Sequence, residues 1–425
     1  MVSPCSPHIV IIGAGFGGLQ TAVSLGGTSA QVTLIDRYNY HTFIPLLYQV
    51  ATATLEPEWI AVPIQSHLRR WTNVHFLQSI VEQIDYGEQR IITDQTTLKY
   101  DYLVLSTGSQ THFRGVPGAQ KYAFPLRTLT DAIALKHHLL QCIEEAAQTP
   151  DPDLRRSLLT FTLVGGGATG VEMAGALVEL CRRAWPKDYP FLRQQPVRLL
   201  IVQSGAELLP EFRQPLRTYT YKRLMNLGVE VQVNTKVTAV YPTHLVLDTG
   251  VHIPCATTIW TTGVTVMLPQ GQTLPQTAQG KIWVLPSLQL QQYPEVYAIG
   301  DIVQLPNQSV TGLAPVAVQQ GTHAACNLRR QLKGYTPQPF RYFHKGRLAM
   351  IGCFLGVGQI GPLLIRGLVG WLLCLVVHWI YVPGYRSRLI ILLTWLQSFM
   401  TGNKLAQQQL MKVRSPSTST IQSPS

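Results

Sequence analysis

A glycine-rich turn near the start of the chain has the residue types and spacing that bind a dinucleotide. The apolar run HIVII leads to Gly13, Gly15 and Gly18, and the later run QVTLID ends in Asp36. The first glycine permits a tight turn, the second lets the backbone approach a pyrophosphate, and the third lets the helix pack on the strand. The helix N-terminus faces the phosphates, and Asp36 lies where a carboxylate can accept hydrogen bonds from a ribose diol.

The same pattern occurs a second time in the middle of the chain. The run TFTLV leads to Gly165, Gly167 and Gly170, and VRLLIV supplies a second strand, but Gln203 stands where the acid would be. An amide can bond a ribose hydroxyl and does not repel a 2′-phosphate, so this turn does not predict a strict preference for NADH over NADPH.

Three further apolar runs are interpreted as returns of the chain to a nucleotide site. They are DYLVLSTGS (101–109), TTIWTTGV (257–264) and EVYAIGD (295–301). We assign Gly263, in the second run, to cofactor binding. Two dinucleotide sites suit an oxidoreductase in which one site holds a flavin dinucleotide and the other receives a nicotinamide dinucleotide, because a hydride can then pass between the two rings.

The positive charge of the chain is concentrated in its last third. Asp301 is the last acidic residue and 12 Lys and Arg residues follow it, while the 22 basic residues before it balance the 22 acidic ones, so the net charge of +12 belongs to the remainder. These cations are spaced among long runs of Leu, Ile, Val and Trp, which suits anionic lipid headgroups better than a nucleic acid. We expect a lipid surface as a partner and no nucleic acid.

The cysteines exclude two other classes of protein. Seven cysteines are scattered without a CxxC pair or the spacing of metal ligands, so we expect no disulfide framework and no metal site. This usage fits a reducing compartment. The N-terminus lacks a charged segment followed by an apolar one, so we predict no signal peptide.

Two apolar segments near the C-terminus predict membrane-facing helices. The first, GLVGWLLCLVVHWIYVP at 367–383, is shorter than the roughly 20 residues that a span requires. The second, RLIILLTWLQSFMTG, carries a polar stripe, namely Thr394, Gln397, Ser398 and Thr401. Such a helix can lie in the membrane interface with its apolar face in lipid. A single span ending near Pro383, a dimer contact and a core helix are the alternatives.

Together these patterns predict an α/β fold with two Rossmann-like dinucleotide-binding domains plus a C-terminal helical membrane-association region. The expected divisions are a first part of the FAD-binding domain at 1–115, an inserted NAD(P)H-binding domain at 116–275, a second part of the FAD-binding domain at 276–345, membrane-anchoring helices at 346–411 and a disordered tail at 412–425.

The chain resembles the two-dinucleotide-binding-domain flavoproteins, and among them the type II NADH:quinone oxidoreductases, which are single-subunit, non-pumping NADH dehydrogenases. The resemblance covers about residues 8–411, and its most specific segments are RYNYHTFIPLLYQVAT (37–52), GGGATGVEMAGAL (165–177), YAIGD (297–301), GLAPVAVQQG (312–321) and FHKGRLAMIG (343–352). It implies bound FAD, NADH or NADPH as donor, and a membrane quinone as acceptor in a ping-pong cycle without proton pumping. It also implies monotopic attachment to the cytoplasmic face of a membrane, and it allows a homodimer.

The resemblance also implies roles for individual residues at the FAD site. The first glycine motif and Asp36 would hold the FAD adenosine, and Thr107 and Gly108 would lie along its pyrophosphate and ribitol. Asp301 would bond the ribityl and pyrophosphate region.

Three more residues are connected with the acceptor side by the same resemblance. Glu172 follows Gly170 on the second helix and would lie near the flavin, between the nicotinamide and quinone sites. A buried carboxylate at that place can relay a proton. The alternative is that an acid in the first turn of a helix merely complements the helix dipole. The family's quinone motif has the form AQxAxQ in some members and here reads APVAVQ at 314–319. We assign Ala317 to cofactor binding and Gln319 to quinone reduction.

Other candidates have two interpretations each. His41 can donate a proton or bond backbone groups, while Tyr48 and Gln49 can line the flavin pocket, with core packing as the alternative for Tyr48. Four aromatic residues fit either an interfacial belt or helix packing: Trp371, Trp379, Tyr381 and Trp395.

Three rival functions share features with this sequence. Disulfide reductases place a CxxxxC pair after the first unit, and residues 37–141 contain no cysteine. A sulfide:quinone reductase would use redox cysteines, whereas the intact second glycine motif favours a nicotinamide donor. A membrane-attached NAD(P)H sensor with little quinone turnover is the non-enzymatic alternative.

Overall fold

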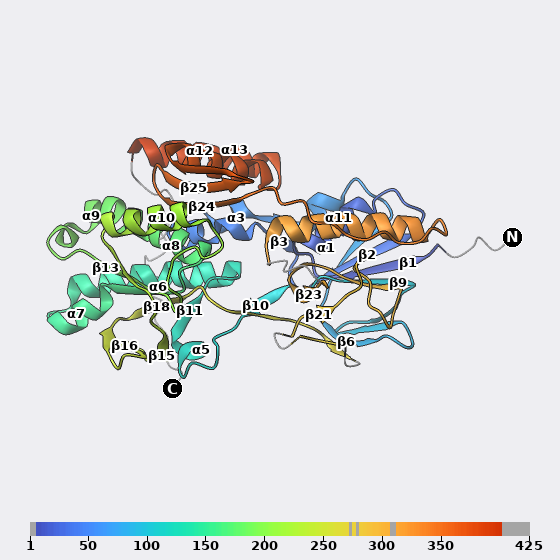
Figure 1. The fold of residues 1–425 in the computed structure, drawn as a ribbon, viewed down its shortest axis with the longest axis horizontal. Helices are drawn as coiled ribbons and strands as arrows, with labels where there is room; N and C mark the ends of the chain where they lie inside the picture. Colours follow the sequence, from blue (N-terminus) through green and yellow to red (C-terminus); the bar gives the residue numbers. More distant parts are fainter. Residues whose placement is uncertain (1–5, 272–273, 278–279, 307–311, 402–425) are drawn as a thin grey trace, which may run out of the picture. The chain divides into compact units, whose positions relative to one another are not determined.

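The computed structural model describes residues 6–271, 274–277, 280–306 and 312–401, which form two compact units (Figure 1). Unit 1 comprises Met1–Thr42, Ala61–His112 and Gly263–Lys345, and unit 2 comprises Phe43–Ile60, Phe113–Thr262 and Gly346–Ser425. The predicted tail at 412–425 and the end of the predicted anchor, from residue 402 onward, lie outside the described residues.

The core of unit 1 is a parallel five-stranded sheet in the order β22-β9-β1-β2-β5. Its strands are β1 His8–Ile12, β2 Gln31–Asp36, β5 Val74–Gln78, β9 Tyr102–Leu105 and β22 Val296–Ala298. The HIVII run forms β1, and its last four residues are buried because strands pair with β1 on both sides.

Two helices of unit 1, α1 Phe16–Ser24 and α11 Ala314–Gln331, lie side by side along this sheet (Figure 1). They touch backbone to backbone, since a Cβ atom added to Gly321 would lie 2.3 Å from the carbonyl oxygen of Gly17. This contact brings the beginning of α11 to the first glycine turn.

Smaller elements complete unit 1. A four-stranded sheet contains β20 Gln270–Gly271, β6 Val81–Asp85, β7 Arg90–Thr93 and β8 Thr97–Lys99. The remaining elements are the strand pairs β10 Ser109–Thr111 with β19 Val264–Val266, β21 Ile282–Trp283 with β23 Val303–Gln304, and β3 Tyr40–Thr42 with β4 Ala61–Pro63, together with α4 Ile64–Leu68 and the 3-10 turn η4 Gly300–Ile302.

Unit 2 repeats the parallel five-stranded sheet, here in the order β11-β18-β12-β13-β14. Its strands are β11 Ala123–Pro125, β12 Thr160–Val164, β13 Arg198–Val202, β14 Val229–Gln232 and β18 Thr257–Trp260. A three-stranded antiparallel sheet contains β15 Val237–Val240, β16 His244–Leu247 and β17 His252–Pro254. The two parallel sheets confirm the predicted α/β class.

The helices of unit 2 include the long α6, whose N-terminus has a capping box between Thr128 and Asp131. Helix α8 continues directly into a π-helical turn, η2. The helical elements before the C-terminal region are η1 Ile44–Leu46, α2 Leu47–Ala51, α3 Pro57–Ile60, α5 Ala119–Tyr122, α6 Leu129–Gln148, α7 Pro152–Leu158, α8 Ala168–Glu179, η2 Leu180–Ala184, α9 Trp185–Asp188, η3 Pro190–Arg193 and α10 Gln214–Asn226.

The C-terminal region of unit 2 is a small sheet followed by two helices. The antiparallel strands β24 Arg347–Gly352, β25 Leu355–Ile360 and β26 Leu363–Gly367 occupy the beginning of a region for which we had expected helices. The two apolar segments form α12 Leu368–Tyr381 and α13 Tyr385–Thr401, which lie side by side in Figure 1. Among the described residues, no helix has both the length and the apolar character needed to cross a membrane.

Candidate functional site

The first glycine turn of unit 1 is shaped by three glycines with different roles. Gly13 has a φ of +98°, and a Cβ atom on Gly18 would lie 1.8 Å from the carbonyl oxygen of Gly13, so backbone geometry requires both glycines. A Cβ atom on Gly15 would instead meet no atom of the described residues within 4 Å, and none of their side chains caps the N-terminus of α1 behind it. The turn therefore leaves open space in front of a helix N-terminus, as a bound pyrophosphate requires.

Asp36 closes this turn at the end of β2. Its Oδ2 atom accepts a hydrogen bond from the Ala14 amide at 2.6 Å, and its Oδ1 atom accepts one from the Tyr38 amide at 2.9 Å. Burial raises the pKa of Asp36, while these two bonds and the neighbouring Arg37 act in the opposite direction. The carboxylate is therefore fixed beside the glycines, and its role as a ribose ligand stays a prediction.

The second glycine turn, in unit 2, has the same construction. Gly165 has a φ of +116°, a Cβ atom on Gly170 would lie 2.0 Å from the Gly165 carbonyl oxygen, and a Cβ atom on Gly167 would meet nothing within 4 Å. Gln203 Oε1 accepts a hydrogen bond from the Gly166 amide at 2.8 Å, as Asp36 does from Ala14. The amide thus takes the place of the carboxylate without its charge.

The nearest carboxylate to Gln203 in this loop is already engaged. Gln203 Nε2 donates to the backbone oxygen of Glu207 at 3.3 Å. The Glu207 side chain forms an ion pair with Arg217 and accepts a hydrogen bond from Gln214 at 2.6 Å. The second turn therefore presents a neutral amide, with its neighbouring acid paired to a cation.

Two of the three segments interpreted as returns to a nucleotide site, 101–109 and 295–301, contact each other within unit 1. Ser109 donates to Asp301 Oδ2 at 2.5 Å, which links the end of the LSTGS segment to the Gly-Asp pair. The Thr107 hydroxyl donates to the backbone oxygen of Met267, and Gly108 has a φ of +71°. Gly263, after β18, has a φ of +78°.

Helix α11 contributes a residue that we did not predict. Gln320 is fully buried, and its Oε1 atom accepts a hydrogen bond from the Gly300 amide at 2.7 Å, while its Nε2 atom has no hydrogen-bond partner among the residues that the structure describes. The preceding Gln319 is used differently, because its amide exchanges two hydrogen bonds with the backbone of Phe343, at 2.9 and 3.0 Å. Ala317 is buried beside Gly17, at the beginning of α1.

Glu172 lies on α8 in unit 2, where the helix packs against β24. The contact is close because a Cβ atom on Gly175 would lie 2.0 Å from the carbonyl oxygen of Ile351. Glu172 Oε1 accepts a hydrogen bond from the Met350 amide at 3.2 Å. Burial raises the pKa of Glu172 from 4.5 to about 8, and the hydrogen bond from the Met350 amide lowers it only partly.

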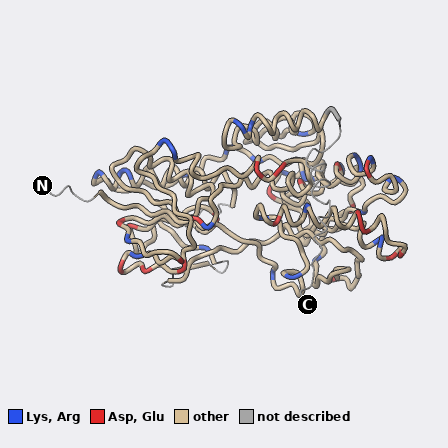
Figure 2. The backbone as a smooth tube through the Cα atoms, turned by 180° about the vertical axis from the view of Figure 1, so that it is seen from behind, with Lys and Arg blue, Asp and Glu red and all other residues tan. Residues whose placement is uncertain are grey.

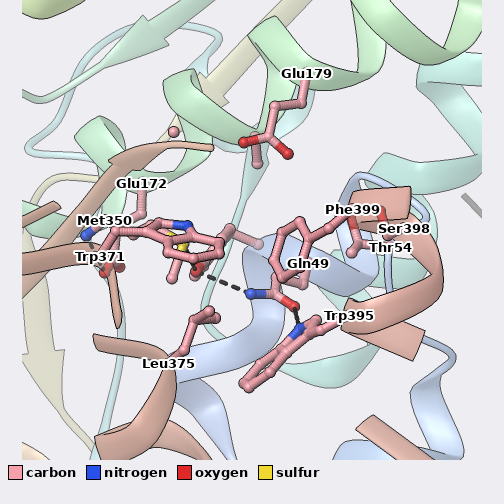
Figure 3. Close-up of a pocket in the computed structure, with 13 residues that line it drawn as sticks. Gln49, Thr54, Glu172, Glu179, Met350, Trp371, Leu375, Trp395, Ser398 and Phe399 are labelled. Carbon is pink, nitrogen blue, oxygen red and sulfur yellow. Dashed lines mark hydrogen bonds between the residues drawn. The ribbon is translucent and has the colours of Figure 1, made fainter. Parts of the chain in front are cut away.

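A pocket of unit 2 opens beside this carboxylate (Figure 3). About 450 Å³ of space between atoms lies in and in front of it, open solvent included. Its walls come from α2, α8, β24, α12 and α13, and the lining residues are Tyr48, Gln49, Thr54, Glu172, Ala176, Glu179, Met350, Gly352, Trp371, Leu375, Trp395, Ser398 and Phe399. The pocket combines aromatic and aliphatic walls with two carboxylates and an amide, which suits a flat, mostly apolar ring with polar ends.

Known proteins are similar to this chain over most of its length. The family described as pyridine nucleotide-disulphide oxidoreductase matches residues 7–321. Two relatives from Mycobacterium tuberculosis are named type II NADH:quinone oxidoreductase Ndh and NdhA. The chain is 32% identical to Ndh over 94% of this chain and 90% of the relative, and 34% identical to NdhA over 92% and 87%.

The chain belongs to the type II NADH:quinone oxidoreductases. This confirms the resemblance seen in the sequence. The structure of NDH2 from Plasmodium falciparum has a similar fold, with a TM-score of 0.87 at 20% identity, covering 93% of this chain and 99% of that one.

Several residues of this type II oxidoreductase are clarified by the structure. His41 is buried and its Nδ1 atom lies 2.9 Å from the carbonyl oxygen of Ala14, so it bonds the backbone of the first glycine turn. Burial lowers the pKa of His41 and keeps the ring neutral. Trp371 and Trp395 are buried and line the pocket, which favours helix packing over an interfacial belt for both; Tyr381 is exposed.

The two C-terminal helices of this oxidoreductase present an apolar outer face. Of the predicted polar stripe, Thr394 is buried and Ser398 lines the pocket, while Gln397 is exposed. Nine aliphatic residues of the two helices are between 37% and 64% exposed, namely Leu368, Val369, Leu372, Val376, Ile380, Leu389, Leu392, Leu393 and Leu396. Acidic residues are absent from both helices (Figure 2), and the first turn of α13 carries Arg386 and Arg388.

Proposed function

We propose that this protein oxidises NADH, and also accepts NADPH, and passes two electrons through bound FAD to a membrane quinone without pumping protons. The observation that carries the proposal is the pair of glycine turns in one chain, together with a separate pocket beside Glu172. The two turns suit a flavin dinucleotide and a nicotinamide donor, and the pocket suits a quinone as the acceptor.

The residues of unit 1 fit FAD. The open space over Gly15 suits the pyrophosphate, and Asp36 suits the adenosine ribose. Thr107, Gly108, Asp301 and Ala317 are proposed to follow the remainder of the cofactor. The unpartnered Nε2 of Gln320 supports the fit, because a buried amide group normally has a hydrogen-bond acceptor. FAD, when bound, supplies the two-electron redox chemistry that the amino acids lack.

The second turn is proposed to bind the nicotinamide donor. Gly165, Gly167 and Gly170 form the phosphate turn, Gln203 faces the adenosine ribose, and Gly263 lies on the return segment. Gln203 brings no negative charge to the place of a 2′-phosphate, which supports NADPH as a second donor.

The pocket of unit 2 is proposed to receive the quinone head. Because the pKa of Glu172 is about 8, its carboxyl is mostly protonated at neutral pH and can give a proton to the reduced ring. Glu179, two turns later on α8, lines the same pocket. Gln319 remains proposed for the acceptor side, although its amide holds the backbone of Phe343.

The outer face of α12 and α13 is proposed to lie in the interface of a membrane, at its cytoplasmic side, as a monotopic attachment. The exposed leucines suit the acyl chains, and the basic residues after Asp301 suit anionic headgroups. A homodimer through the same face is the alternative arrangement, because it would also cover the apolar residues.

The proposal is tested by steady-state kinetics of the purified protein with FAD. NADH oxidation should depend on an added short-chain quinone, and plots at several quinone concentrations should give the parallel lines of a ping-pong cycle. Sulfide in place of NADH should give no turnover. A nucleotide sensor would bind NADH and FAD but show no oxidation that rises with quinone, and this result would overturn the proposal.

A further inference from the structure

The pocket contains a buried chain of hydrogen bonds that joins α13 to α2. Trp395 Nε1 donates to Gln49 Oε1 at 2.8 Å, and Gln49 Nε2 donates to Tyr48 Oη at 3.1 Å. The Tyr48 hydroxyl lies 3.5 Å from Met350 Sδ. The side chains of Trp395, Gln49 and Tyr48 are each at most 5% exposed. Figure 3 shows the Gln49 amide with its oxygen toward the Trp395 indole nitrogen.

The chemistry of the three groups fixes the direction of this chain. An indole N–H can only donate, so Gln49 must turn its carbonyl oxygen to Trp395 and its NH₂ group to Tyr48. The Tyr48 oxygen therefore accepts, and its own proton must point elsewhere. Within the described part of the chain it meets the thioether of Met350, which is a weak acceptor.

The surroundings keep the Tyr48 hydroxyl in its donor form. Burial, and next the nearby Glu172 carboxylate, raise the pKa of Tyr48 well above 10. The hydroxyl is therefore protonated throughout the working pH range. It is a fixed donor in a pocket that otherwise has mostly apolar walls.

We propose that the Tyr48 hydroxyl donates a hydrogen bond to one carbonyl oxygen of the quinone, and that Gln49 and Trp395 are positioning residues that aim it. This inference rests on the proposed quinone function. A carbonyl oxygen is a stronger acceptor than a thioether, so the quinone replaces Met350 as the partner of the hydroxyl. Tyr48 keeps its proton and transfers no electron, so its part is to orient the ring.

The test compares four variants in anaerobic stopped-flow experiments. They are Tyr48→Phe, Trp395→Phe, the double variant, and Trp379→Phe as a matched control. Like Trp395, Trp379 donates a hydrogen bond from its indole nitrogen, in this case to the backbone oxygen of Arg388 on α13 at 2.9 Å. Trp379 is not among the residues that line the pocket. Each protein is reduced with NADH and mixed with increasing menadione or ubiquinone-1, and the half-saturating quinone concentration for flavin reoxidation is measured.

Loss of one neutral hydrogen bond predicts a half-saturating concentration about 3- to 10-fold higher for Tyr48→Phe. Trp395→Phe should shift in the same direction by less, because Gln49 can then rotate. The double variant should bind quinone no more weakly than Tyr48→Phe alone, since no Tyr48 hydroxyl remains for Trp395 and Gln49 to orient. Reduction by NADH, and reoxidation by ferricyanide, should match the unsubstituted protein in all variants.

Several results would overturn the inference. An unchanged half-saturation for Tyr48→Phe removes the hydroxyl from quinone binding. If the increases in half-saturating quinone concentration multiply in the double variant, or if Trp379→Phe shows an equal increase, the cause is loosened helix packing and not the orientation of the Tyr48 hydroxyl. If the unsubstituted protein itself is not reoxidised by any quinone, the proposed function fails first, and this outcome is distinct from a working parent with an unaffected Tyr48→Phe variant.

Discussion

Replacing Glu172 with glutamine tests the proton-donating role of the pocket carboxyl. With a pKa of about 8, Glu172 is protonated in about nine of ten molecules at pH 7. Glutamine has nearly the same shape and can still accept the Met350 amide bond, but it has no proton to give. We expect flavin reoxidation by quinone to slow by about 100-fold or more, which is typical for loss of a general acid.

The pH dependence of stability provides a second, independent readout of the same substitution. The unfolded state loses the Glu172 proton near pH 4.5, whereas the folded state keeps it to about pH 8. Because the folded state binds the extra proton between these values, this group makes the free energy of unfolding fall as pH rises from about 4.5 to 8, by up to about 5 kcal/mol. The glutamine variant should lack this fall and be the more stable protein above pH 8.

The assay pairs stopped-flow half-reactions with urea unfolding at pH 5, 7 and 9. NADH reduction of the flavin should be unchanged in Glu172→Gln, since the substitution affects only the acceptor side. A variant that is reoxidised by quinone as fast as the parent refutes the proton-donor role. An unfolding free energy with the same pH profile as the parent refutes the raised pKa.

Three further predictions follow from the glycine turns and the outer face. Gly15→Ala should fold with parental thermal stability but hold FAD at least about 10-fold more weakly, since the added methyl enters only the open space, as a flavin-release titration would measure. Gln203→Glu should lower kcat/KM for NADPH at least about 10-fold while preserving that for NADH, because a carboxylate repels the 2′-phosphate; equal losses for both donors would count against this placement. Leu393→Glu with Leu396→Glu should reduce co-sedimentation with anionic vesicles at least about 10-fold without changing turnover with a soluble acceptor, and unchanged vesicle binding would move the interface elsewhere.

The two glycine turns could be predicted from sequence because their determinants are local. Strand, glycines and helix follow one another within a few residues, and the turn positions are set by backbone clashes that only glycine avoids. The two C-terminal helices were likewise visible as long apolar segments. The strands β24 to β26 were missed because they are short and lie between glycines, with no alternating pattern long enough to stand out.

The pocket could not be assembled from sequence because its walls are far apart in the chain. Gln49 and Trp395 are separated by 346 positions, yet they share a hydrogen bond. Gln320 also could not be predicted from sequence, since only the helical phase of α11 determines that its amide turns to Gly300 while that of Gln319 turns to Phe343. The role proposed for Glu172 came from the family resemblance, whereas its burial and its bond with the Met350 amide are set by tertiary packing.

Anaerobic stopped-flow of the purified protein tests the central claim most directly. The flavin absorbance is followed while NADH, or NADPH, and then a short-chain quinone are added. Rapid bleaching by the donor followed by rapid recovery with quinone is the predicted result, and the relative rates with the two donors measure what Gln203 permits. Bleaching without recovery would contradict the account, because the protein would then take electrons from the nicotinamide without giving them to a quinone.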